Sequence, residues 1–233
     1  MAIDRSDEPE PAEPSRREAR EEPVNEDRGA LYTRLWEAAD RQEFGVAMDR
    51  LRNEVQPKLR EMVEETRDTV PGAALVGLEF ELKGEERSWD KVDTMMRTRP
   101  EMSPVDAVAR IPDGVRYTFQ FDAQDYAQGH DQVCELYKQR GYELEYRWNA
   151  WEHAEYKGIN TRWRSPDGDL FEVQFHTPES FAAKQATHGA YEQIRDPATG
   201  HAERTRLHSY QREVAGSVPI PEDVREIEDY EKG

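Results

Sequence analysis

Apolar residues recur every three or four positions over residues 31–62, which is the spacing of one face of an amphipathic helix. The stripe consists of Leu31, Leu35, Trp36, Phe44, Met48, Leu51, Val55, Leu59 and Met62. Because proline lacks a backbone N–H and clashes with the preceding turn, Pro57 predicts a kink or a break near Gln56. We expect residues 29–70 to form N-terminal helices that pack on the domain that follows.

Five later segments alternate apolar and polar residues, which is typical of strands with one buried face. They are residues 78–82, 115–121, 142–148, 159–163 and 171–175. The last two flank a turn-forming run rich in Pro, Asp and Gly, so they predict a β-hairpin.

Helical signals separate these strands. Ser88 is placed to cap a short helix. Further helices are predicted over 104–110, over 123–140 and from Thr177 to about Arg195. The order of elements predicts an α+β domain over residues 71–196, with a mixed β-sheet flanked by helices. A polar and helical extension, 197–216, and an acidic tail, 217–233, follow it.

The charge of the chain limits its partners. Fifty Asp and Glu residues against 32 Lys and Arg give a formal net charge of −18 over 233 residues. Proteins that bind the nucleic-acid backbone present an excess of cations, so general DNA binding is excluded, and a nucleic-acid partner would need a local basic pocket. Residues 1–28 carry ten acids, five arginines and four prolines, and we expect a disordered acidic leader or linker there.

Three further features narrow the class of protein. Cys134 is the only cysteine, so no internal disulfide can form. No apolar run reaches about 18 residues, and we therefore expect no membrane-spanning helix. No apolar segment follows Met1, so a standard signal peptide is not expected, and we place the protein in the cytoplasm or, by another export route, outside the cell.

Chemically useful side chains share one face of the predicted hairpin. Because side chains alternate across a strand, burial of Phe171, Val173 and Phe175 places the residues between them together on the opposite face. That face carries Glu172, Gln174 and His176 on one strand and Asn160, Arg162 and Arg164 on the other. The pattern indicates a candidate site, although an ordinary solvated sheet face has the same pattern.

Three stretches resemble motifs of the RelA/SpoT-homologue alarmone synthetases, and they come in the order in which that family has them. The stretch EYKGINTRWRSPDGDLFEVQFHT, residues 155–177, resembles the family's hairpin segment. LKGEERSWDKV, residues 82–92, is similar to its basic loop, and IPDGVRYTF, residues 111–119, to its Asp-x-x-Gly-x-Arg strand start. The resemblance covers roughly residues 75–195 and is nearest to small or exported ATP:nucleotide 3'-pyrophosphokinases and to synthetase-like toxins.

The resemblance implies a nucleotidyltransferase-like fold and an enzyme that depends on Mg²⁺. Such enzymes transfer the β,γ-pyrophosphate of ATP to the 3'-hydroxyl of a nucleotide, which gives products of the pppGpp, ppGpp or ppApp type, or to the 3' end of a tRNA. ATP and an acceptor nucleotide are therefore the expected partners, and for a toxin a protein inhibitor is expected as well. The task requires cations along the triphosphate and a base for the attacking hydroxyl.

The resemblance also implies roles for single residues. Asp113 is expected to bind the metal, and Glu172 is expected to be the second metal contact or the general base for the 3'-hydroxyl. The residues expected at the donor phosphates are Lys83, Ser88, Lys91 and Arg116. The other nucleotide-binding candidates are Tyr156, as the platform for the acceptor base, Asn160, Gln174 and His176.

The chain departs from the family pattern at several positions. Glu81 stands where the family has an arginine, Asn160 where it has a histidine, and His176 where it has an arginine. Glu85 and Glu86 lie within the basic loop. A non-catalytic module of the same fold that binds a nucleotide or a protein is therefore the alternative function. An unrelated interaction domain built around the first helices is a third one.

Each candidate also has an ordinary structural interpretation. Asp113 precedes a glycine and suits a turn, most lysines are solvated, and Tyr156 suits the edge of a core. Cys134 is expected to be a buried helix residue. On the last predicted helix, the spacing of large side chains favours a packed and solvated stripe, in which Lys184 and His188 are the residues placed to line a cleft.

Overall fold

The computed structural model describes residues 26–233, with side chains from Trp36 onward. Its centre is a six-stranded mixed sheet within this part of the chain, so the α+β class with helices flanking the sheet is confirmed. The predicted leader, 1–28, lies outside the described residues except for its last three, which begin a helix. No helix of the described residues is long and apolar enough to cross a membrane.

The strands follow the order β1-β2-β5-β4-β3-β6 across the sheet. They are β1 Ala74–Val76, β2 Arg116–Gln120, β3 Glu143–Asn149, β4 Ile159–Arg164, β5 Leu170–His176 and β6 Tyr230–Glu231. β2 and β5 run parallel, and the other neighbouring strands run antiparallel. β4 and β5 form the predicted hairpin, which the bond from the Ser165 N–H to the Asp169 carbonyl closes at 2.9 Å.

The first two described helices form one long rod with an irregular centre. α2, Glu26–Arg50, continues through a π-helical turn, Leu51–Val55, into α3, Gln56–Thr69. Pro57 lies in the first turn of α3, and the π turn just before it lets the rod continue past a residue that has no N–H to donate. Of the kink or break predicted near Gln56, the break is wrong, and the irregularity takes the form of a π turn.

The remaining helices are α4 Glu85–Thr98, α5 Pro104–Ala109, α6 Tyr126–Gln139, α7 Pro178–Arg195 and α8 His201–Gly216. Caps fix two of their starts: the Ser103 side chain accepts from the Asp106 N–H in α5, and Thr177 forms a capping box with Ser180 in α7. The cap predicted for Ser88 is wrong, because α4 begins earlier with Gly84 as its N-cap residue.

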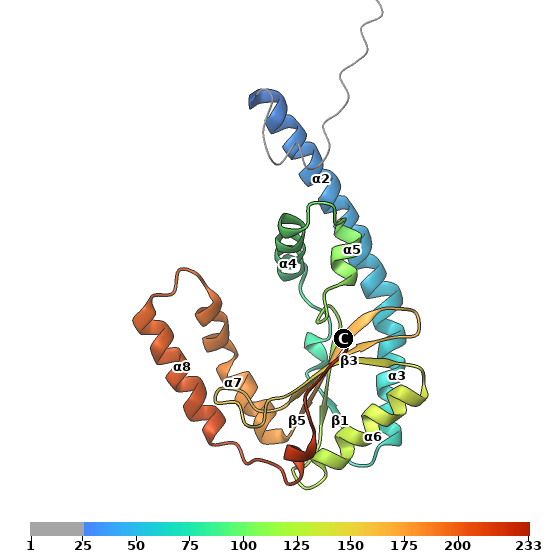
Figure 1. Cartoon of the computed structure of the whole chain (residues 1–233), viewed down its shortest axis with the longest axis vertical. Helices are drawn as coiled ribbons and strands as arrows, with labels where there is room; N and C mark the ends of the chain where they lie inside the picture. Colours follow the sequence, from blue (N-terminus) through green and yellow to red (C-terminus); the bar gives the residue numbers. More distant parts are fainter. Residues whose placement is uncertain (1–25) are drawn as a thin grey trace, which may run out of the picture.

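The main core lies between one face of the sheet and helices α3 and α6 (Figure 1). Its sheet residues include Tyr117, Phe119, Trp163, Val173 and Phe175, and its helix residues include Leu59, Val63, Val133 and Tyr137. Each large apolar side chain buried in this way contributes about 1.5–3 kcal/mol. A second, smaller cluster joins α2 to α4 and α5. The opposite face of the sheet is therefore free to pack against α7 and to carry polar side chains.

Residues 78–82 do not form the strand that their alternation predicts. β1 ends at Val76, Gly77 takes a φ of 66°, and Leu78–Phe80 form a 3₁₀ turn. Glycine adopts this left-handed conformation without steric cost, so the chain turns away from β2 before the alternating residues begin and meets it again only at Leu82, which forms an isolated antiparallel bridge with Val115.

A β-bulge divides the predicted strand 142–148. Leu144 pairs with Trp163 and Tyr146 pairs with Arg162, so Glu145 is an extra residue in β3. Leu144 consequently packs on the core, whereas Tyr146 and Trp148 lie on the opposite, polar face, where unbroken alternation would not have placed them.

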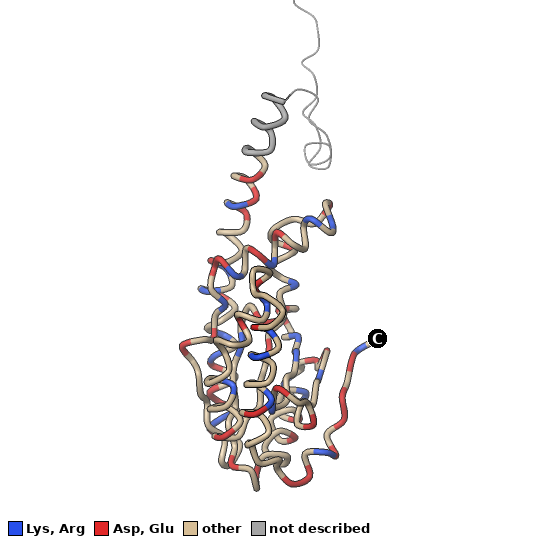
Figure 2. The backbone as a smooth tube through the Cα atoms, turned by 90° about the vertical axis from the view of Figure 1, so that its left-hand side faces the viewer, with Lys and Arg blue, Asp and Glu red and all other residues tan. Residues whose placement is uncertain are grey.

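The acidic tail, 217–233, lies against the edge of the sheet. Its last turn is the 3₁₀ segment Val224–Glu226, and β6 pairs with β3. The Arg147 Nε donates to the Glu228 carbonyl at 2.7 Å, and Lys232 binds Glu143. Figure 2 shows that acidic residues dominate this segment up to the C-terminus.

The packing of α6 on β2 predicts the effect of one added methyl group. A Cβ at Gly129 would lie 2.4–2.7 Å from the ring of Phe121, which is fully buried. We expect Gly129→Ala to lower the free energy of unfolding by about 1–3 kcal/mol, measured by urea denaturation. Gly189→Ala in α7 is the control, because no atom lies within 4 Å of that added Cβ. It is expected to stabilise by about 0.5–1 kcal/mol, and equal effects of both changes would contradict the packing described.

Candidate active site

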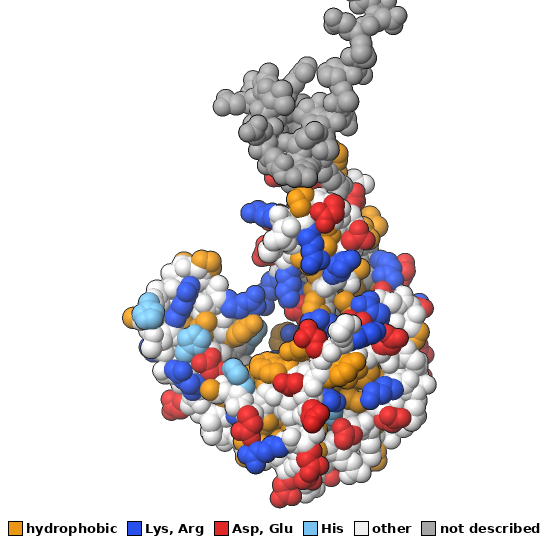
Figure 3. Space-filling view, viewed as in Figure 1, with side chains coloured by type: hydrophobic (Ala, Val, Ile, Leu, Met, Phe, Trp, Pro, Cys, Tyr) orange, Lys and Arg blue, Asp and Glu red, His pale blue; other side chains and the backbone are white. Residues whose placement is uncertain are grey.

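The polar face of β2, β5 and β4 forms the floor of a hollow between α4 and α7. Figure 3 shows the molecule hollowed between the arm made by α7 and α8 and the helices above it, with Lys and Arg side chains along the upper rim. One ion pair spans this rim, since Arg87 Nη2 of α4 lies 2.8 Å from Glu192 Oε2 of α7.

Strand register confirms the faces that alternation predicts for the hairpin. Glu172 of β5 lies between Arg116 of β2 and Arg162 of β4, and Gln174 lies beside Asn160. The residues between them point into the core and are buried. A carboxylate at the centre of this face is therefore flanked by a guanidinium group on either side.

Asp113, in the loop before β2, binds two lysines. Lys83 Nζ donates to Asp113 Oδ2 at 2.8 Å, and Lys91 Nζ donates to Oδ1 at 2.7 Å. The Lys83 N–H also donates to the Gly114 carbonyl at 3.0 Å, which ties the basic loop to the start of β2. Burial alone would raise the pKa of Asp113, but the two ammonium groups outweigh it and lower the pKa to about 2. Asp113 is therefore ionised at neutral pH.

Glu172 has the opposite environment. Burial raises its pKa, Arg116 opposes this rise, and the charge of Asp113 adds to it, so the two carboxylates lie within electrostatic reach of each other. Gln174 Nε2 donates to Glu172 Oε1, and Lys184 Nζ of α7 donates to Gln174 Oε1. A carboxylate with a raised pKa accepts a proton more readily near neutral pH, as a general base must.

The hydroxyl of Tyr156 joins the loop before β4 to β4 and β5. It donates to Asn160 Oδ1 at 2.8 Å, and His176 Nε2 lies 3.1 Å from the same hydroxyl oxygen. Burial lowers the pKa of His176 well below its usual range, so the ring is neutral. The His176 Nδ1 lies 2.9 Å from the Ser180 hydroxyl oxygen, and that hydroxyl donates to the Thr177 carbonyl. His176 thus lies buried behind Tyr156 and supports it.

Gly158 makes this arrangement possible. Its φ is 148°, and a Cβ there would lie 2.8 Å from the His176 ring and 2.9 Å from the Phe175 carbonyl. The chain can therefore pass close over β5 between Tyr156 and Asn160 only with glycine at this position.

An aromatic wall adjoins Tyr156, and the sequence interpretation missed it. The rings of Trp148 and Tyr156 are stacked, with centroids 5.8 Å apart and an angle of 14° between their planes. The guanidinium of Arg162 lies 5.4 Å from the centroid of the Tyr146 ring. Both aromatic residues of β3 reach this face through the bulge at Glu145, which no local pattern in the sequence signals.

Two of the three acidic residues that depart from the family pattern, Glu81 and Glu85, are paired with arginines. Arg60 Nη1 donates to Glu81 Oε1 at 2.8 Å, and Arg52 Nη2 donates to Glu85 Oε1 at 2.5 Å. The negative charge of these two side chains is therefore balanced by arginines of α3 and of the π turn. Ser88 is fully buried in α4, and within the described residues its hydroxyl has no hydrogen-bond partner.

The polar face thus brings together most of the residues predicted for the site and several residues that were not predicted for it. Lys83, Lys91, Asp113, Arg116, Tyr156, Asn160, Glu172 and Gln174 line it or lie at its edge. Ser88 and His176 lie beneath the surface. Arg162, Lys184 and Trp148 join the face. Alternation had placed Arg162 on it, whereas Lys184 had been assigned to a packed and solvated stripe as one of two residues that could line a cleft.

The donor atoms of the carboxylate pair fit a magnesium ion. Mg²⁺ prefers oxygen ligands and is usually held by one or two carboxylates together with substrate phosphates. Asp113 and Glu172 offer such oxygens, and within the described residues no hydrogen bond reaches Glu172 Oε2. No group of three or more His, Cys, Asp or Glu side chains is arranged for a metal ion among the residues that the structure describes.

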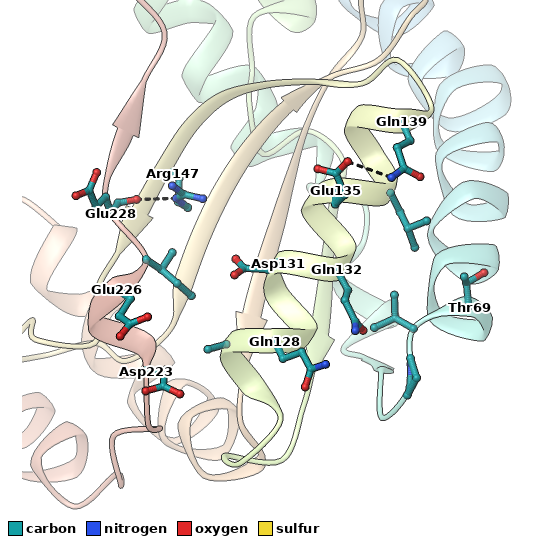
Figure 4. Close-up of a pocket in the computed structure, with 15 residues that line it drawn as sticks. Thr69, Gln128, Asp131, Gln132, Glu135, Gln139, Arg147, Asp223, Glu226 and Glu228 are labelled. Carbon is teal, nitrogen blue, oxygen red and sulfur yellow. Dashed lines mark hydrogen bonds between the residues drawn. The ribbon is translucent and has the colours of Figure 1, made fainter.

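A separate cavity of about 960 Å³ lies on the other side of the sheet, between α6, the end of α3 and the tail. Figure 4 shows the carboxylates of Asp131, Glu135, Glu226 and Glu228 around it, with Arg147 on one wall. An acidic lining repels phosphate, so this cavity does not suit a nucleoside triphosphate.

Comparison with solved structures relates the fold to known enzymes. Small alarmone synthetase 2 from Bacillus subtilis aligns at a TM-score of 0.48 and 12% identity, over 76% of this chain and 90% of that one. Small alarmone synthetase 1 from the same organism, bound to its product pppGpp, aligns at 0.46 and 9%, over 70% and 87%. The type VI effector Tas1, in complex with its immunity protein, aligns at 0.46 and 17%, over 76% and 96%.

The chain is similar in fold to small alarmone synthetases. The similarity concerns the fold alone. No protein-family model and no curated protein sequence matches the chain. A functional assignment therefore rests on the residues of the polar face.

The ion pairs of Asp113 predict a measurable contribution to stability. Asp113→Asn leaves Lys83, whose side chain is 16% exposed, without its charged partner, and we expect the free energy of unfolding to fall by about 1–3 kcal/mol. Asp167→Asn is the control, because its pair with Lys58 is exposed, and should cost less than about 0.5 kcal/mol.

The loss at Asp113 should depend on pH. A carboxyl group whose pKa is lower in the folded state stabilises the fold above its unfolded pKa of about 3.9 and loses this effect as the pH falls through its folded pKa. The difference between wild type and Asp113→Asn should therefore be full at pH 6 and shrink towards a pH of about 2. Urea denaturation at several pH values measures it, and a difference that grows in acid would contradict the ion pairs.

Proposed function

We propose that the chain is a Mg²⁺-dependent pyrophosphokinase that transfers the β,γ-pyrophosphate of ATP to the 3'-hydroxyl of a nucleotide or of a tRNA 3' end. One observation carries the proposal: four cationic side chains surround two carboxylates on a single face of a protein whose net charge is −18. The cations are Lys83, Lys91, Arg116 and Arg162. Such a local reversal of charge suits a compact polyanion such as a triphosphate.

The donor triphosphate belongs at the end of the face where the basic loop meets β2. Lys83, Lys91 and Arg116 meet there, and phosphate oxygens compete with Asp113 for the two ammonium groups. Entry of the nucleotide would thus free carboxylate oxygens of Asp113 for the metal. When bound by Asp113, Mg²⁺ would supply neutralisation of the phosphate charge that develops during transfer.

The acceptor belongs on the aromatic side, where Trp148 and Tyr156 lie. Their stacked rings offer an apolar surface for a nucleobase, beside the amide of Asn160. Burial and the charge of Glu172 raise the pKa of the Tyr156 hydroxyl, which therefore stays protonated and keeps its bond to Asn160. Glu172 lies between the two binding areas, as the transfer requires.

The chemical step is an in-line displacement at the β-phosphorus of ATP. The 3'-oxygen forms a bond to that phosphorus, the bond from it to the oxygen bridging the α- and β-phosphates breaks, and AMP leaves. The proton of the 3'-hydroxyl passes to Glu172, whose raised pKa suits a proton acceptor. The product acts as an alarmone, or the reaction itself depletes the ATP of a target cell, as a toxin would.

The proposal is tested by incubating the purified chain with ATP, Mg²⁺ and a panel of acceptors. The panel comprises GDP, GTP, AMP, ADP, ATP and tRNA, and we expect AMP together with one 3'-pyrophosphorylated product. Glu172→Gln removes the base and should lower the rate about 10²- to 10⁴-fold. Chelation of Mg²⁺ by EDTA should abolish the reaction. Glu135→Gln, on the exposed side of α6, is the matched control and should leave the rate unchanged.

The alternative is a non-catalytic module of the same fold. Calorimetry with a non-hydrolysable ATP analogue separates the two, because binding without AMP release from ATP under any acceptor would support the module and reject the enzyme. Absence of both binding and turnover would leave the third function, an interaction domain.

The aromatic wall predicts a change in acceptor affinity. Stacking of a base on an aromatic side chain contributes about 1–3 kcal/mol, so Trp148→Ala should raise the KM for the acceptor about 5- to 150-fold and leave the KM for ATP unchanged. Trp148→Phe retains a stacking surface and should restore most of the affinity. Tyr210→Ala, at an exposed position on α8, is the control. An equal rise in both KM values would show that the wall does not serve the acceptor.

A further inference from the structure

A buried chain of hydrogen bonds connects α7 to Glu172. Lys184 Nζ donates to Gln174 Oε1, and Gln174 Nε2 donates to Glu172 Oε1. Gln174 is only 6% exposed, and Lys184 is half-buried. The lysine is therefore not one of the solvated residues of the α7 stripe, which was its ordinary interpretation from the sequence.

The chemistry of the ammonium group fixes which group donates in each of these two hydrogen bonds. An ammonium group donates three hydrogen bonds and accepts none, so it can face only the oxygen of the Gln174 amide. The amide NH₂ group is thereby turned towards Glu172, where it donates to one carboxylate oxygen. Without Lys184, the amide is free to rotate by half a turn and to present its oxygen to the carboxylate, which would repel it.

We propose that Lys184 is a positioning residue that fixes the amide of Gln174, so that one oxygen of Glu172 is held and the other is directed to the substrate. This inference rests on the proposed function of Glu172 as the base or metal contact of pyrophosphate transfer. It assigns to α7 a part in the reaction that goes beyond covering the sheet. Lys184 touches neither reacting atom in this role and acts through Gln174 alone.

The surroundings of Lys184 agree with a fixed donor. Burial and the nearby Arg116 lower its pKa to about 8, while Glu172 raises it, so the amine carries a proton at neutral pH. Its Nζ lies 5.5 Å from the centroid of the Phe181 ring, one turn earlier on α7. The neighbouring His176 is neutral and faces Tyr156 and Ser180 instead. The ammonium group is therefore held by Gln174 of the sheet and lies beside the ring of Phe181 on its own helix.

The test compares Lys184→Met with Lys184→Arg. Methionine has a similar length and no donor, and loss of a residue that orients a reactive group costs about 10- to 100-fold in activity. We expect kcat to fall by that factor in Lys184→Met with the KM values for ATP and acceptor unchanged, and to recover in Lys184→Arg, which keeps a donor. Lys138→Met, at an exposed position on α6, is the control.

A second measurement does not depend on turnover. The side-chain NH₂ signals of Gln174 in a ¹H–¹⁵N spectrum, assigned with Gln174→Leu, report on the hydrogen bond to Glu172. They should shift in Lys184→Met and stay near their wild-type positions in Lys184→Arg. Should Lys184→Met fail to fold, Gln174→Leu replaces it in the kinetic test and is expected to lower kcat by the same factor.

The outcomes separate this inference from the proposed function. Wild-type kcat in Lys184→Met with unshifted Gln174 signals overturns the positioning role, and a raised KM for ATP with intact kcat also overturns it, because Lys184 would then bind phosphate directly. If the wild-type chain forms no product, the proposed function fails, and the Gln174 signals alone decide whether Lys184 orients the amide.

Discussion

The parallel pairing of β2 with β5 is the constraint on which the candidate site depends. Because the two strands run in the same direction, the loop that carries Asp113 and the start of β5 meet at one end of the sheet, and Arg116 lies beside Glu172. An antiparallel pairing would have placed these groups at opposite ends. A shift of the register by a single residue would turn Glu172 into the core, so the buried rings of Tyr117 and Phe119 that fix the register also fix the chemistry.

Alternation in the sequence was enough to predict the hairpin face, because a strand buried on one side leaves no choice for the side chains between the buried ones. The faces of Glu172, Gln174 and Asn160 follow from that rule alone. The rule fails where the backbone leaves the regular pattern. Gly77 turns the chain out of the sheet before residues 78–82, and Glu145 adds one residue to β3. Gly77 is a local feature that alternation alone does not take into account, whereas the bulge at Glu145 is decided by pairing with β4.

The same limit explains the residues that were missed. Trp148 was assigned with the other apolar residues of its strand, and only the bulge moves its ring onto Tyr156. Lys184 was recognised as one member of a helical stripe, but its contact with Gln174 depends on the angle at which α7 leaves β5 after the Thr177 cap. Sequence patterns give the face of an element reliably, whereas contacts between elements require their relative placement.

The net charge of the protein and the local charge of the site affect the binding of different ligands. At physiological ionic strength, charges farther apart than about 8 Å are largely screened, so the acidic surface and tail have little effect on a ligand that is bound within the hollow. Cations that touch a buried phosphate are not screened in this way, because they act through a medium of lower dielectric constant. Glu81 and Glu85, two of the acids in or beside the basic loop, are each paired with an arginine. The excess of acids therefore opposes binding along an extended polyanion such as DNA, while it leaves a cleft of two arginines and two lysines free to hold a small one.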